Sequence, residues 1–494
     1  MAAGRGRNHP FRRAHRVVAI VRRHRDAIHA RRTGPDVALH APKDVGRPGM
    51  SRRGTTKRIE RDGMKTIVIA GGGTAGLQLA ARLGRQLGNR GLANIVLVDR
   101  YRTHLWKPLL HEVAAGKLEP YIHHTSFALQ ARRYGFRFVQ GEFTSLDRDN
   151  RTLAITTSGC DGVTHTTTLT YDTLVLAIGG TTQYFGVPGA SEHALALDSV
   201  PGAEYARTQI VDALRRVSSQ AKATDRPARA SVAIIGAGAT GVQLAAQVRQ
   251  MSRVLSQYGI HSLDPDRGTE VLLVEASGNI LPGMDRRLAD TTAAELQAQG
   301  IQILLNTRVT EVRPDCLHIA GAAPIAADVT VWTAGVTVSP VLSNIGLQVT
   351  RNGRVRVGDT LQTLEDKHIY ALGDCASFRP AGEQAELPTR AQVAHQQAIY
   401  LAHALPRVLA GKSVGRFTFR DRGSVISLAD DMALCHLLAP GSSDGWQVRG
   451  ALAKLVHRVI YRRHMLAVQG FARTAAMALS QRLERLLGAG YRLD

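Results

Sequence analysis

A repeated glycine pattern constrains this sequence more than any other feature. Residues 66–84 read TIVIAGGGTAGLQLAARLG, and residues 231–248 read SVAIIGAGATGVQLAAQV. Each copy has a short apolar, β-branched run before GxGxxG and an apolar-periodic helix after it. In such units one glycine permits the tight turn, one lets a pyrophosphate approach the backbone, and one allows helix and strand to pack closely. The sequence therefore predicts an α/β fold with two Rossmann-like dinucleotide-binding domains.

Two acidic residues follow the glycine motifs at the ends of the next strands. NIVLVDR reaches Asp99, 23 residues after Gly76, and EVLLVEA reaches Glu275, 34 residues after Gly241. An acid at this position accepts hydrogen bonds from the adenosine ribose, and the free N–H groups of the helix start bind the pyrophosphate. The longer second spacing predicts an extended helix or an insertion between residues 245 and 268. The expected nucleotide-binding residues are Gly71, Gly72, Gly73, Thr74, Ala75, Gly76, Asp99 and Arg100 in the first copy, and Gly236, Gly238, Gly241 and Glu275 in the second.

Three later segments complete this organisation. Residues 171–180, YDTLVLAIGG, and residues 328–336, DVTVWTAGV, resemble the strands by which a chain leaves each nucleotide fold. Residues 367–376, KHIYALGDCA, return to the first fold and place Asp374 at the C-terminal end of a strand, where ligands of open α/β sheets bind. Two nucleotide sites in one chain indicate one bound dinucleotide cofactor and one dinucleotide substrate. The predicted domains are 64–190 and 356–430 for the two parts of the first fold, and 191–355 for the second.

The net charge of +23 in 494 residues is concentrated at the two ends of the chain. Residues 1–63 contain 15 arginines and 2 lysines against 5 acidic residues and lack a regular apolar pattern, so we predict a disordered extension. An alternative interpretation places the true start of translation at Met64, directly before the first strand. A nucleic-acid-binding arm is the third interpretation, because arginine-rich segments bind phosphates without sequence preference.

The C-terminal region, residues 431–494, is basic and contains a stretch with apolar residues at helical spacing. Residues 451–494 hold 8 basic and 2 acidic residues among Leu, Val, Ile, Met and Phe. No part of the chain approaches the roughly 20 consecutive apolar residues that a membrane-spanning helix needs. A basic amphipathic helix instead lies in the plane of a membrane surface, so we predict an amphipathic membrane-associating segment here. Docking on the protein itself or on a second subunit is the alternative.

The motifs GGGTAG, ATGVQ, WTAGV and IYALGDCA, in this order, resemble the flavoprotein reductases with two dinucleotide-binding domains. THLWKPLLHEVAAGKL at 103–118 and PTRAQVAHQQA at 388–398 narrow the resemblance to the type II NADH dehydrogenases. These are peripheral NADH:quinone oxidoreductases that pump no protons. The resemblance covers residues 64–494.

The resemblance implies non-covalent FAD in the first fold, NADH as the substrate of the second, and a membrane quinone as the electron acceptor. A hydride passes from NADH to FAD, and two electrons then pass to the quinone. It also implies a respiratory enzyme on the cytoplasmic face of the inner (plasma) membrane, a possible homodimer and no specific nucleic-acid partner. Its further site residues are Asp374, Ala391 and Gln392 at the flavin, Ala334 and Gly335 at the nicotinamide, and Gln392 and Gln396 at the quinone.

One residue departs from the family pattern. The family usually has Glu directly after the second GV, whereas this chain has Gln243. Glutamine can form hydrogen bonds but cannot transfer a proton as an acid or base. We retain Gln243 and Gln392 as catalytic candidates with that restriction. Gln78 occupies the corresponding position in the first copy, where we expect a structural role.

Several residues keep two interpretations. His104, Lys107 and His111 in the 103–118 segment either approach the flavin or stabilise the loop. Gln392 and Gln396 lie four residues apart, so they also fit an ordinary polar stripe on one helix face.

Two other functions compete with NADH oxidation. A sulfide:quinone oxidoreductase would need paired redox cysteines, whereas Cys160, Cys316, Cys375 and Cys435 are scattered and form no CxxC motif. A flavin-binding sensor with a nucleic-acid-binding tail would depend on residues 1–63. The sequence predicts no metal site.

Overall fold

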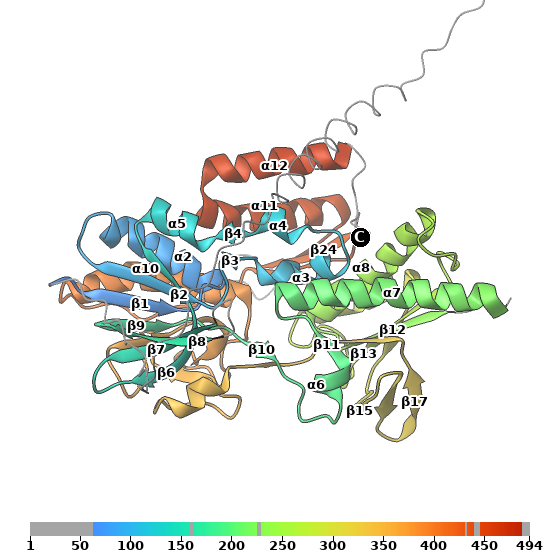
Figure 1. Cartoon of the computed structure of the whole chain (residues 1–494), viewed down its shortest axis with the longest axis horizontal. Helices are drawn as coiled ribbons and strands as arrows, with labels where there is room; N and C mark the ends of the chain where they lie inside the picture. The colour runs from blue at the N-terminus through green and yellow to red at the C-terminus, as the bar shows by residue number, and fades with distance from the viewer. Residues whose placement is uncertain (1–62, 159–162, 225–228, 430–431, 439–444, 487–494) are drawn as a thin grey trace, which may run out of the picture. The chain divides into compact units, whose positions relative to one another are not determined.

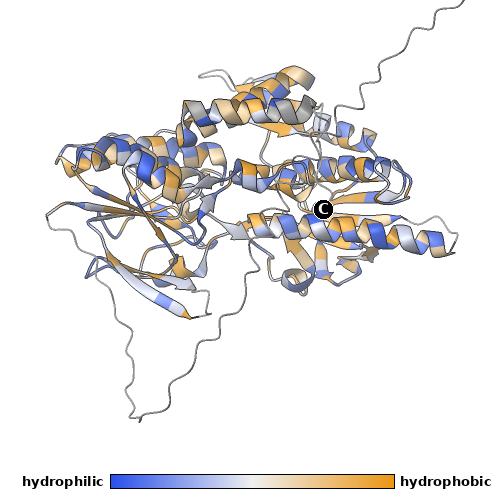
Figure 2. Cartoon of the chain, turned by 45° about the horizontal axis from the view of Figure 1, so that its top comes forward, coloured by the Kyte–Doolittle hydropathy of each residue, from blue (hydrophilic) through white to orange (hydrophobic). Residues whose placement is uncertain are grey.

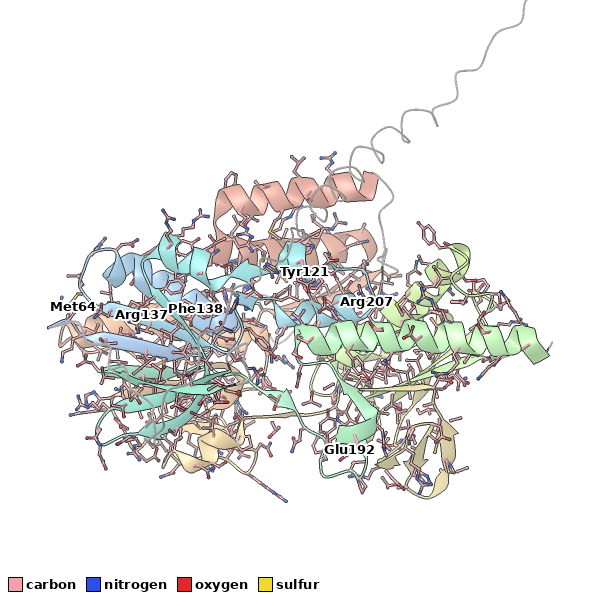
Figure 3. The ribbon with its side chains drawn as sticks, viewed as in Figure 1. Met64, Tyr121, Arg137, Phe138, Glu192 and Arg207 are labelled. Carbon is pink, nitrogen blue, oxygen red and sulfur yellow. The ribbon has the colours of Figure 1, made fainter. Side chains whose placement is uncertain are left out.

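The computed structural model describes residues 63–158, 163–224, 229–429, 432–438 and 445–486. The predictions for the basic N-terminal extension therefore lie outside the described residues, except for Gly63, and so does Cys160. Two parallel sheets organise the described part of the chain (Figure 1). Figure 3 marks Arg137 and Phe138 on the first sheet's fold, and Glu192 and Arg207 on the second.

The first sheet is parallel and has the strand order β21-β9-β1-β2-β5. Its central strand, TIVIA, is buried at every position after the first, because helices cover both faces of such a sheet. The helix after β1 packs against α10, which lies more than 300 residues later in the chain. The elements are β1 (Thr66–Ala70), α2 (Thr74–Leu83), η2 (Gly84–Gly88), β2 (Asn94–Asp99), α5 (Phe127–Tyr134), β5 (Arg137–Gln140), β9 (Thr173–Leu176), β21 (Ile369–Ala371), η5 (Gly373–Cys375) and α10 (Ala391–Leu409).

The second sheet repeats this arrangement, with five parallel strands in the order β11-β18-β12-β13-β14. The helix after its central strand continues to Gln257, and residues 258–268 lead to the next strand, so both account for the longer glycine-to-acid spacing. The elements are α6 (Ala190–His193), β11 (Ala194–Ala196), α7 (Val200–Thr224), β12 (Ala230–Ile235), α8 (Ala239–Gln257), β13 (Thr269–Val274), α9 (Arg286–Ala298), β14 (Ile301–Leu304) and β18 (Val329–Trp332).

One connection between the two folds is a pair of short strands. The outgoing strand β10 (Thr181–Thr182) pairs antiparallel with the returning strand β19 (Val336–Thr337). Val338 and Leu342 then pack in the first hydrophobic core. By packing, the second fold therefore ends near residue 337 rather than at the predicted residue 355, because the chain returns before that point.

The 103–118 segment joins the two folds. Its apolar side chains, among them Leu105, Trp106 and Leu110, pack in the hydrophobic core of the second fold, although the segment follows β2 of the first. Residues 103–118 therefore contribute to both folds, and the predicted range 64–190 does not follow the packing here. The local elements are β3 (Thr103–His104), η3 (Lys107–Leu109), α3 (Leu110–Ala114), α4 (Pro120–His123) and β4 (Thr125–Ser126).

Smaller sheets extend the two folds. Three of them are antiparallel and three-stranded: β6-β7-β8, β15-β16-β17 and β23-β24-β25. Their bounds, and those of the remaining short elements, are β6 (Glu142–Asp147), β7 (Thr152–Ser158), β8 (Thr164–Thr170), β15 (Val309–Val312), β16 (Cys316–Ile319), β17 (Ala322–Ala326), η4 (Pro340–Asn344), β20 (Val355–Val357), β22 (Ala376–Phe378), β23 (Gly423–Ser427), β24 (Ala433–Leu438) and β25 (Gly445–Arg449).

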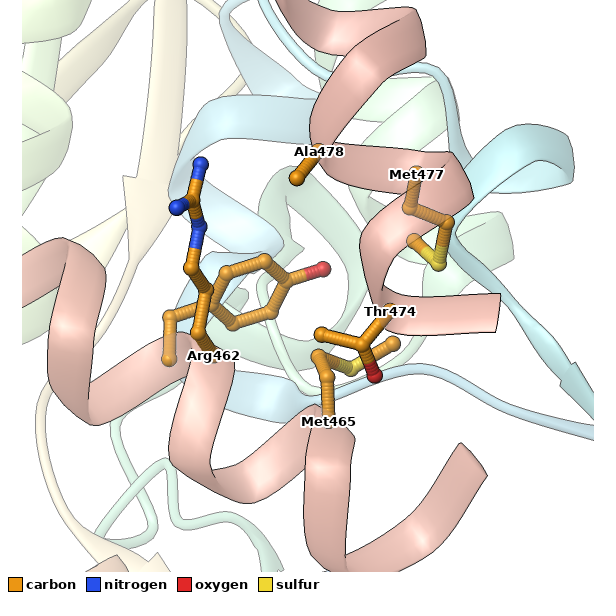
Figure 4. Close-up of a pocket in the computed structure, with 6 residues that line it drawn as sticks. Arg462, Met465, Thr474, Met477 and Ala478 are labelled. Atoms are coloured by element: carbon orange, nitrogen blue, oxygen red, sulfur yellow. The ribbon is translucent and has the colours of Figure 1, made fainter. Parts of the chain in front are cut away.

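Two helices end the described chain, α11 (Gly450–Gln469) and α12 (Phe471–Leu486). Gly470, with φ +76°, connects them, and α12 folds back against α11 (Figure 1). Met465 of α11 faces Thr474 and Met477 of α12 across a small gap (Figure 4). Within the described residues, no helix is long and apolar enough to cross a membrane.

Candidate active site

The first glycine motif forms an open cradle at the start of α2. Gly71 has φ +109°, and a Cβ there would collide with the carbonyl oxygen of Ala177. A Cβ on Gly76 would collide with the carbonyl oxygen of Gly71, so both positions require glycine. In contrast, a Cβ on Gly73 would meet nothing within 4 Å, and no side chain caps the helix that Thr74 begins. The uncapped N–H groups and the open space suit an anionic group such as a pyrophosphate.

Asp99 closes the side of this cradle. Its carboxylate accepts hydrogen bonds from the backbone N–H groups of Gly72, at 2.6 Å, and Tyr101, at 2.8 Å. Burial raises the pKa of the Asp99 carboxyl, while those two bonds and the charges of Arg100 and Lys107 lower it. Arg100 itself forms an ion pair with Glu142 at 3.4 Å.

The second glycine motif repeats the same geometry. Gly236 has φ +99° and packs against Ala334, and a Cβ on Gly241 would collide with the carbonyl oxygen of Gly236. A Cβ on Gly238 would again meet nothing within 4 Å, and α8 has no side-chain cap. Glu275 takes the place of Asp99, because its carboxylate accepts the backbone N–H of Ala237 at 2.8 Å.

Asp374 and Lys107 lie where the crossing strands meet the first fold. Lys107 donates from Nζ to the carbonyl oxygen of Gly180 at 2.9 Å. A Cβ on Gly180 would lie 3.5 Å from the Cβ of Asp374, so both residues adjoin the crossing. Burial raises the pKa of the Asp374 carboxyl, and the charges of Lys107 and Arg354 lower it.

Gln392 and Gln396 both bind the chain segment that precedes β23. The Gln392 side chain accepts from the backbone N–H of Arg422 at 2.8 Å and donates to Asp421 at 3.2 Å. The Gln396 side chain accepts from the backbone N–H of Arg420 at 3.1 Å and donates to its carbonyl oxygen at 2.8 Å. The two amides therefore fasten residues 420–423 across the first turns of α10, which begins at Ala391.

Gln397 is a residue that sequence reasoning missed. It is buried, and its side-chain oxygen accepts the backbone N–H of Gly373 at 2.7 Å, directly before Asp374. This bond positions the Asp374 turn against α10. The sequence signal for Gln397 was its helical spacing from the apolar residues Val393, Ala394 and Leu401. A polar residue on such a face is buried and needs a hydrogen-bond partner.

The paired glutamines of the two copies differ in their surroundings. Gln78 is fully buried in α2, and its amide has no hydrogen-bond partner among the described residues. Gln243 is 8% exposed in α8. Neither side chain can transfer a proton.

A second missed residue, His464 of α11, lies beside the 103–118 segment. Its ring stacks on Trp106 with centroids 5.2 Å apart, and the His104 ring lies 5.8 Å away. Burial lowers the pKa of His104 to about 4, and a hydrogen bond to the Gly72 backbone opposes that shift. Burial also lowers the pKa of His111 to about 3 and that of His464 well below its usual value. These buried histidines are neutral at pH 7, and His104 alone touches the glycine cradle.

The described cysteines do not form a redox pair. Cys316, Cys375 and Cys435 are free thiols. Cys375 is buried and donates to the carbonyl oxygens of Leu372 and Leu176, and burial raises its pKa to about 11. Burial raises the pKa of Cys435 to about 11 as well. A thiol with such a pKa is a poor nucleophile at neutral pH. Among the described residues, no group of three or more His, Cys, Asp or Glu could hold a metal ion.

Comparisons with known proteins found relatives that match most of the chain. A type II NADH:quinone oxidoreductase of Haemophilus influenzae is 33% identical over 440 residues, covering 86% of this chain and 98% of the relative. The enzyme of the same name from Staphylococcus aureus is 27% identical, covering 82% and 96%.

Solved structures share the fold. NDH2 from Plasmodium falciparum in complex with NADH superposes with a TM-score of 0.74 and 16% identity, covering 87% of this chain and 99% of that one. The sulfide:quinone oxidoreductase of Aquifex aeolicus superposes with a TM-score of 0.66 at 16% identity, covering 82% and 92%. Residues 65–398 match the pyridine nucleotide-disulphide oxidoreductase family. The chain belongs to that family and, within it, to the type II NADH:quinone oxidoreductases.

Proposed function

We propose that this protein oxidises NADH and reduces a membrane quinone through FAD, without pumping protons. The observation that carries this function is the duplicated cradle. Each copy has an open central glycine, an uncapped helix start and an acid that accepts a backbone N–H. Both cradles lie at the C-terminal ends of parallel strands, in folds that the paired strands β10 and β19 connect.

The first cradle is proposed to hold FAD. Gly71 to Gly76 and the start of α2 would hold the pyrophosphate, with Asp99 toward the adenosine ribose. Arg100 would act through its neighbour Asp99, and Asp374 follows the edge strand β21 of the same sheet. FAD, when bound, supplies the group that accepts a hydride and passes on two electrons. The residues supply position and charge: Lys107, for example, neutralises the site next to both acids.

The second cradle is proposed to hold NADH. Gly236, Gly238 and Gly241 suit its pyrophosphate, and Glu275 suits an unphosphorylated ribose because its charge repels a 2′-phosphate. Ala334 packs against Gly236 and leads through Gly335 into the crossing strand β19. A dinucleotide that follows this path would extend its nicotinamide end toward the first fold.

The quinone is proposed to approach the start of α10. Gln392 and Gln396 would act there by holding residues 420–423 in place, because their amides are engaged with that segment. Gln243 would orient a ligand by hydrogen bonding without supplying a proton. The family's usual carboxylate chemistry at that position is therefore not available to this chain.

Peripheral membrane association through α11 and α12 is the last part of the proposal. On α11 the polar residues His464 and Gln469 are buried, whereas a row of aliphatic residues is exposed. A helix whose outer face meets water has the opposite pattern, with polar residues exposed and apolar residues buried. Two exposed arginines, Arg462 and Arg463, lie beside that row and suit anionic lipid headgroups. Figure 2 shows the hydrophobic and hydrophilic residues on the two helices. The exposed aliphatic residues of α11 are Leu452, Leu455, Val459, Ile460 and Leu466, which are 42–59% accessible.

An anaerobic absorbance titration tests the redox function. The purified yellow protein is titrated with NADH and then with a soluble quinone. Loss of the flavin absorbance on adding NADH, and its return on adding quinone, is the expected result. A flavin that NADH does not bleach, while dithionite does, would overturn the assignment of NADH to the second cradle.

Vesicle sedimentation tests the membrane surface. Deleting α11 would also remove residues that are buried against the rest of the protein. The test therefore combines two substitutions of exposed residues, Leu455→Asp and Val459→Asp, in one variant. Leu92→Asp is the matched control, because Leu92 is 59% exposed on the first fold. Binding to vesicles of phosphatidylglycerol and phosphatidylcholine should fall about tenfold in the double variant only. Equal sedimentation of all three proteins would contradict the proposal.

A further inference from the structure

Phe185, between the crossing strand β10 and α6, combines two unusual properties. It has φ +54°, in the left-handed region that bulky side chains rarely adopt. It is also 61% exposed, although it is a large apolar residue. A single exposed aromatic residue is ordinary on a protein surface. Exposure together with a strained backbone is more typical of a functional site, since the surrounding structure must impose that conformation.

The neighbouring residues impose it. The indole Nε1 of Trp332 donates to the carbonyl oxygens of Gln183 and Ala334, each at 3.0 Å, and so ties the Phe185 segment to the loop before β19. The ring of Tyr184 packs against Trp332 with centroids 5.7 Å apart. The Phe185 segment is thus attached to residues 332–335 at several points.

The phenyl ring then lies against Gly335. A Cβ on Gly335 would come within 2.6 Å of the Phe185 ring atom Cε2, so any larger residue there would displace the ring. Gly335 has φ +71°, which also favours glycine. Both the Phe185 ring and the positive φ therefore favour glycine at this position, and the ring and Gly335 form one continuous surface.

This surface lies on the route between the two nucleotide cradles. On one side, Ala334 packs against Gly236 of the second cradle. On the other, Val336 packs against Gly180, which adjoins Asp374 of the first fold. A dinucleotide that extends along these residues from the second cradle toward the first fold would pass Gly335.

We propose that Phe185 is a positioning residue whose ring forms the wall against which the nicotinamide of NADH or NAD+ packs beside Gly335. The inference rests on the proposed function, because it needs NADH in the second cradle. Aromatic faces favour stacked contact with a flat heteroaromatic ring, and the exposed surface of Phe185 would then be covered by the ligand. The ring contacts nicotinamide and leaves the adenosine diphosphate part of the ligand untouched.

Two ligands separate this contact from the rest of the site. NAD+ carries nicotinamide, whereas ADP-ribose has the same adenosine, pyrophosphate and second ribose without it. Binding of each to the FAD-loaded protein is measured by calorimetry. Phe185→Ala should raise the Kd for NAD+ about tenfold and leave that for ADP-ribose unchanged. Phe185→Tyr should bind NAD+ as the unsubstituted protein does.

Controls exclude a general structural effect. Phe185→Gly removes the ring while accepting the positive φ, so it guards against misfolding of the alanine variant. Tyr205→Ala, at a 58% exposed aromatic residue of the same fold, should change neither affinity. Flavin content and melting temperature are recorded for every variant.

Other outcomes would overturn the inference. An equal loss of both ligands in Phe185→Gly would mean that Phe185 maintains the fold. Unchanged or tighter NAD+ binding would mean that the ring does not support the nicotinamide. If the unsubstituted protein bound neither ligand, the assignment of the second cradle would itself fail, and this inference with it.

Discussion

The two nucleotide folds of this chain share a backbone plan and differ in what covers it. In the first, a Cβ on Gly72 would come within 2.5 Å of the Phe127 ring and 3.1 Å of an Asp99 carboxylate oxygen. In the second, Ala237 occupies the corresponding position and its Cβ is accommodated. Phe127 of α5 thus crowds the first cradle, and no such residue demands glycine at Ala237. The comparison shows that packing against Phe127 requires glycine in the first cradle, whereas the second accepts the methyl group of Ala237.

Substituting the last glycine of each motif gives the largest expected effect among the tests of this comparison. A Cβ at either Gly76 or Gly241 would collide with a backbone oxygen, which cannot move aside. Gly76→Ala should reduce FAD content at least about tenfold, whereas Gly241→Ala should remain yellow and lose reduction by NADH. Absorbance spectra before and after NADH measure both. Gly415→Ala, where a Cβ meets nothing within 4 Å, is the control.

A reciprocal exchange at the second residue of the two glycine motifs sharpens the comparison. Gly72→Ala should weaken FAD binding about tenfold because the methyl group meets Phe127, while Ala237→Gly should change the NADH KM by less than about twofold. Flavin release in mild denaturant and steady-state kinetics provide the two readouts. Normal flavin retention in Gly72→Ala would show that the Phe127 ring does not require glycine at this position.

Two buried histidines of the 103–118 segment predict a loss of stability in acid. His104 and His111 have folded-state pKa values of about 4 and about 3, below the usual 6.5. The unfolded chain therefore binds more protons below about pH 6.5, so stability falls as the pH decreases toward 4. Between pH 7 and pH 5, His104 and His111 each contribute about 2 kcal/mol to this loss of stability.

Unfolding in urea at the two pH values measures that effect. His111→Gln should reduce the difference in unfolding free energy between pH 7 and pH 5. His165→Gln, at an exposed residue, should leave it unchanged. An unaltered pH dependence in His111→Gln would show that His111 does not stay neutral in the folded protein. A single unfolding transition would show that the two folds, which share the 103–118 segment, unfold together.

The strand-end acids Asp99 and Glu275 provide a further test of the comparison. Glu275→Gln removes the charge that repels a 2′-phosphate and should lower the preference for NADH over NADPH about tenfold. Asp99→Asn should leave that preference unchanged and loosen FAD instead. The ratio of kcat/KM for the two substrates measures the first effect, and flavin retention the second. A changed preference in Asp99→Asn would contradict the division of tasks between the folds.

Sequence reasoning predicted the parts of the site that depend on short-range patterns. The spacing of Gly71, Gly73 and Gly76 predicts the cradle because a strand, a tight turn and a helix start are all set by neighbouring residues. The family-derived roles of Gln392, Gln396 and Gly335 stay predictions. The structure adds specific neighbours to them: a backbone segment for the two glutamines and Phe185 for the glycine.

The sequence by itself determined the α/β class, the two nucleotide folds and their order, because glycine spacing and strand periodicity act within about 30 residues. Only the tertiary structure decided that residues 103–118 pack in the second core, that His464 stacks on Trp106 and that Phe185 lies against Gly335. Each of these contacts joins segments far apart in the chain. Their pairing depends on how the two folds and the C-terminal helices pack, which no local pattern encodes.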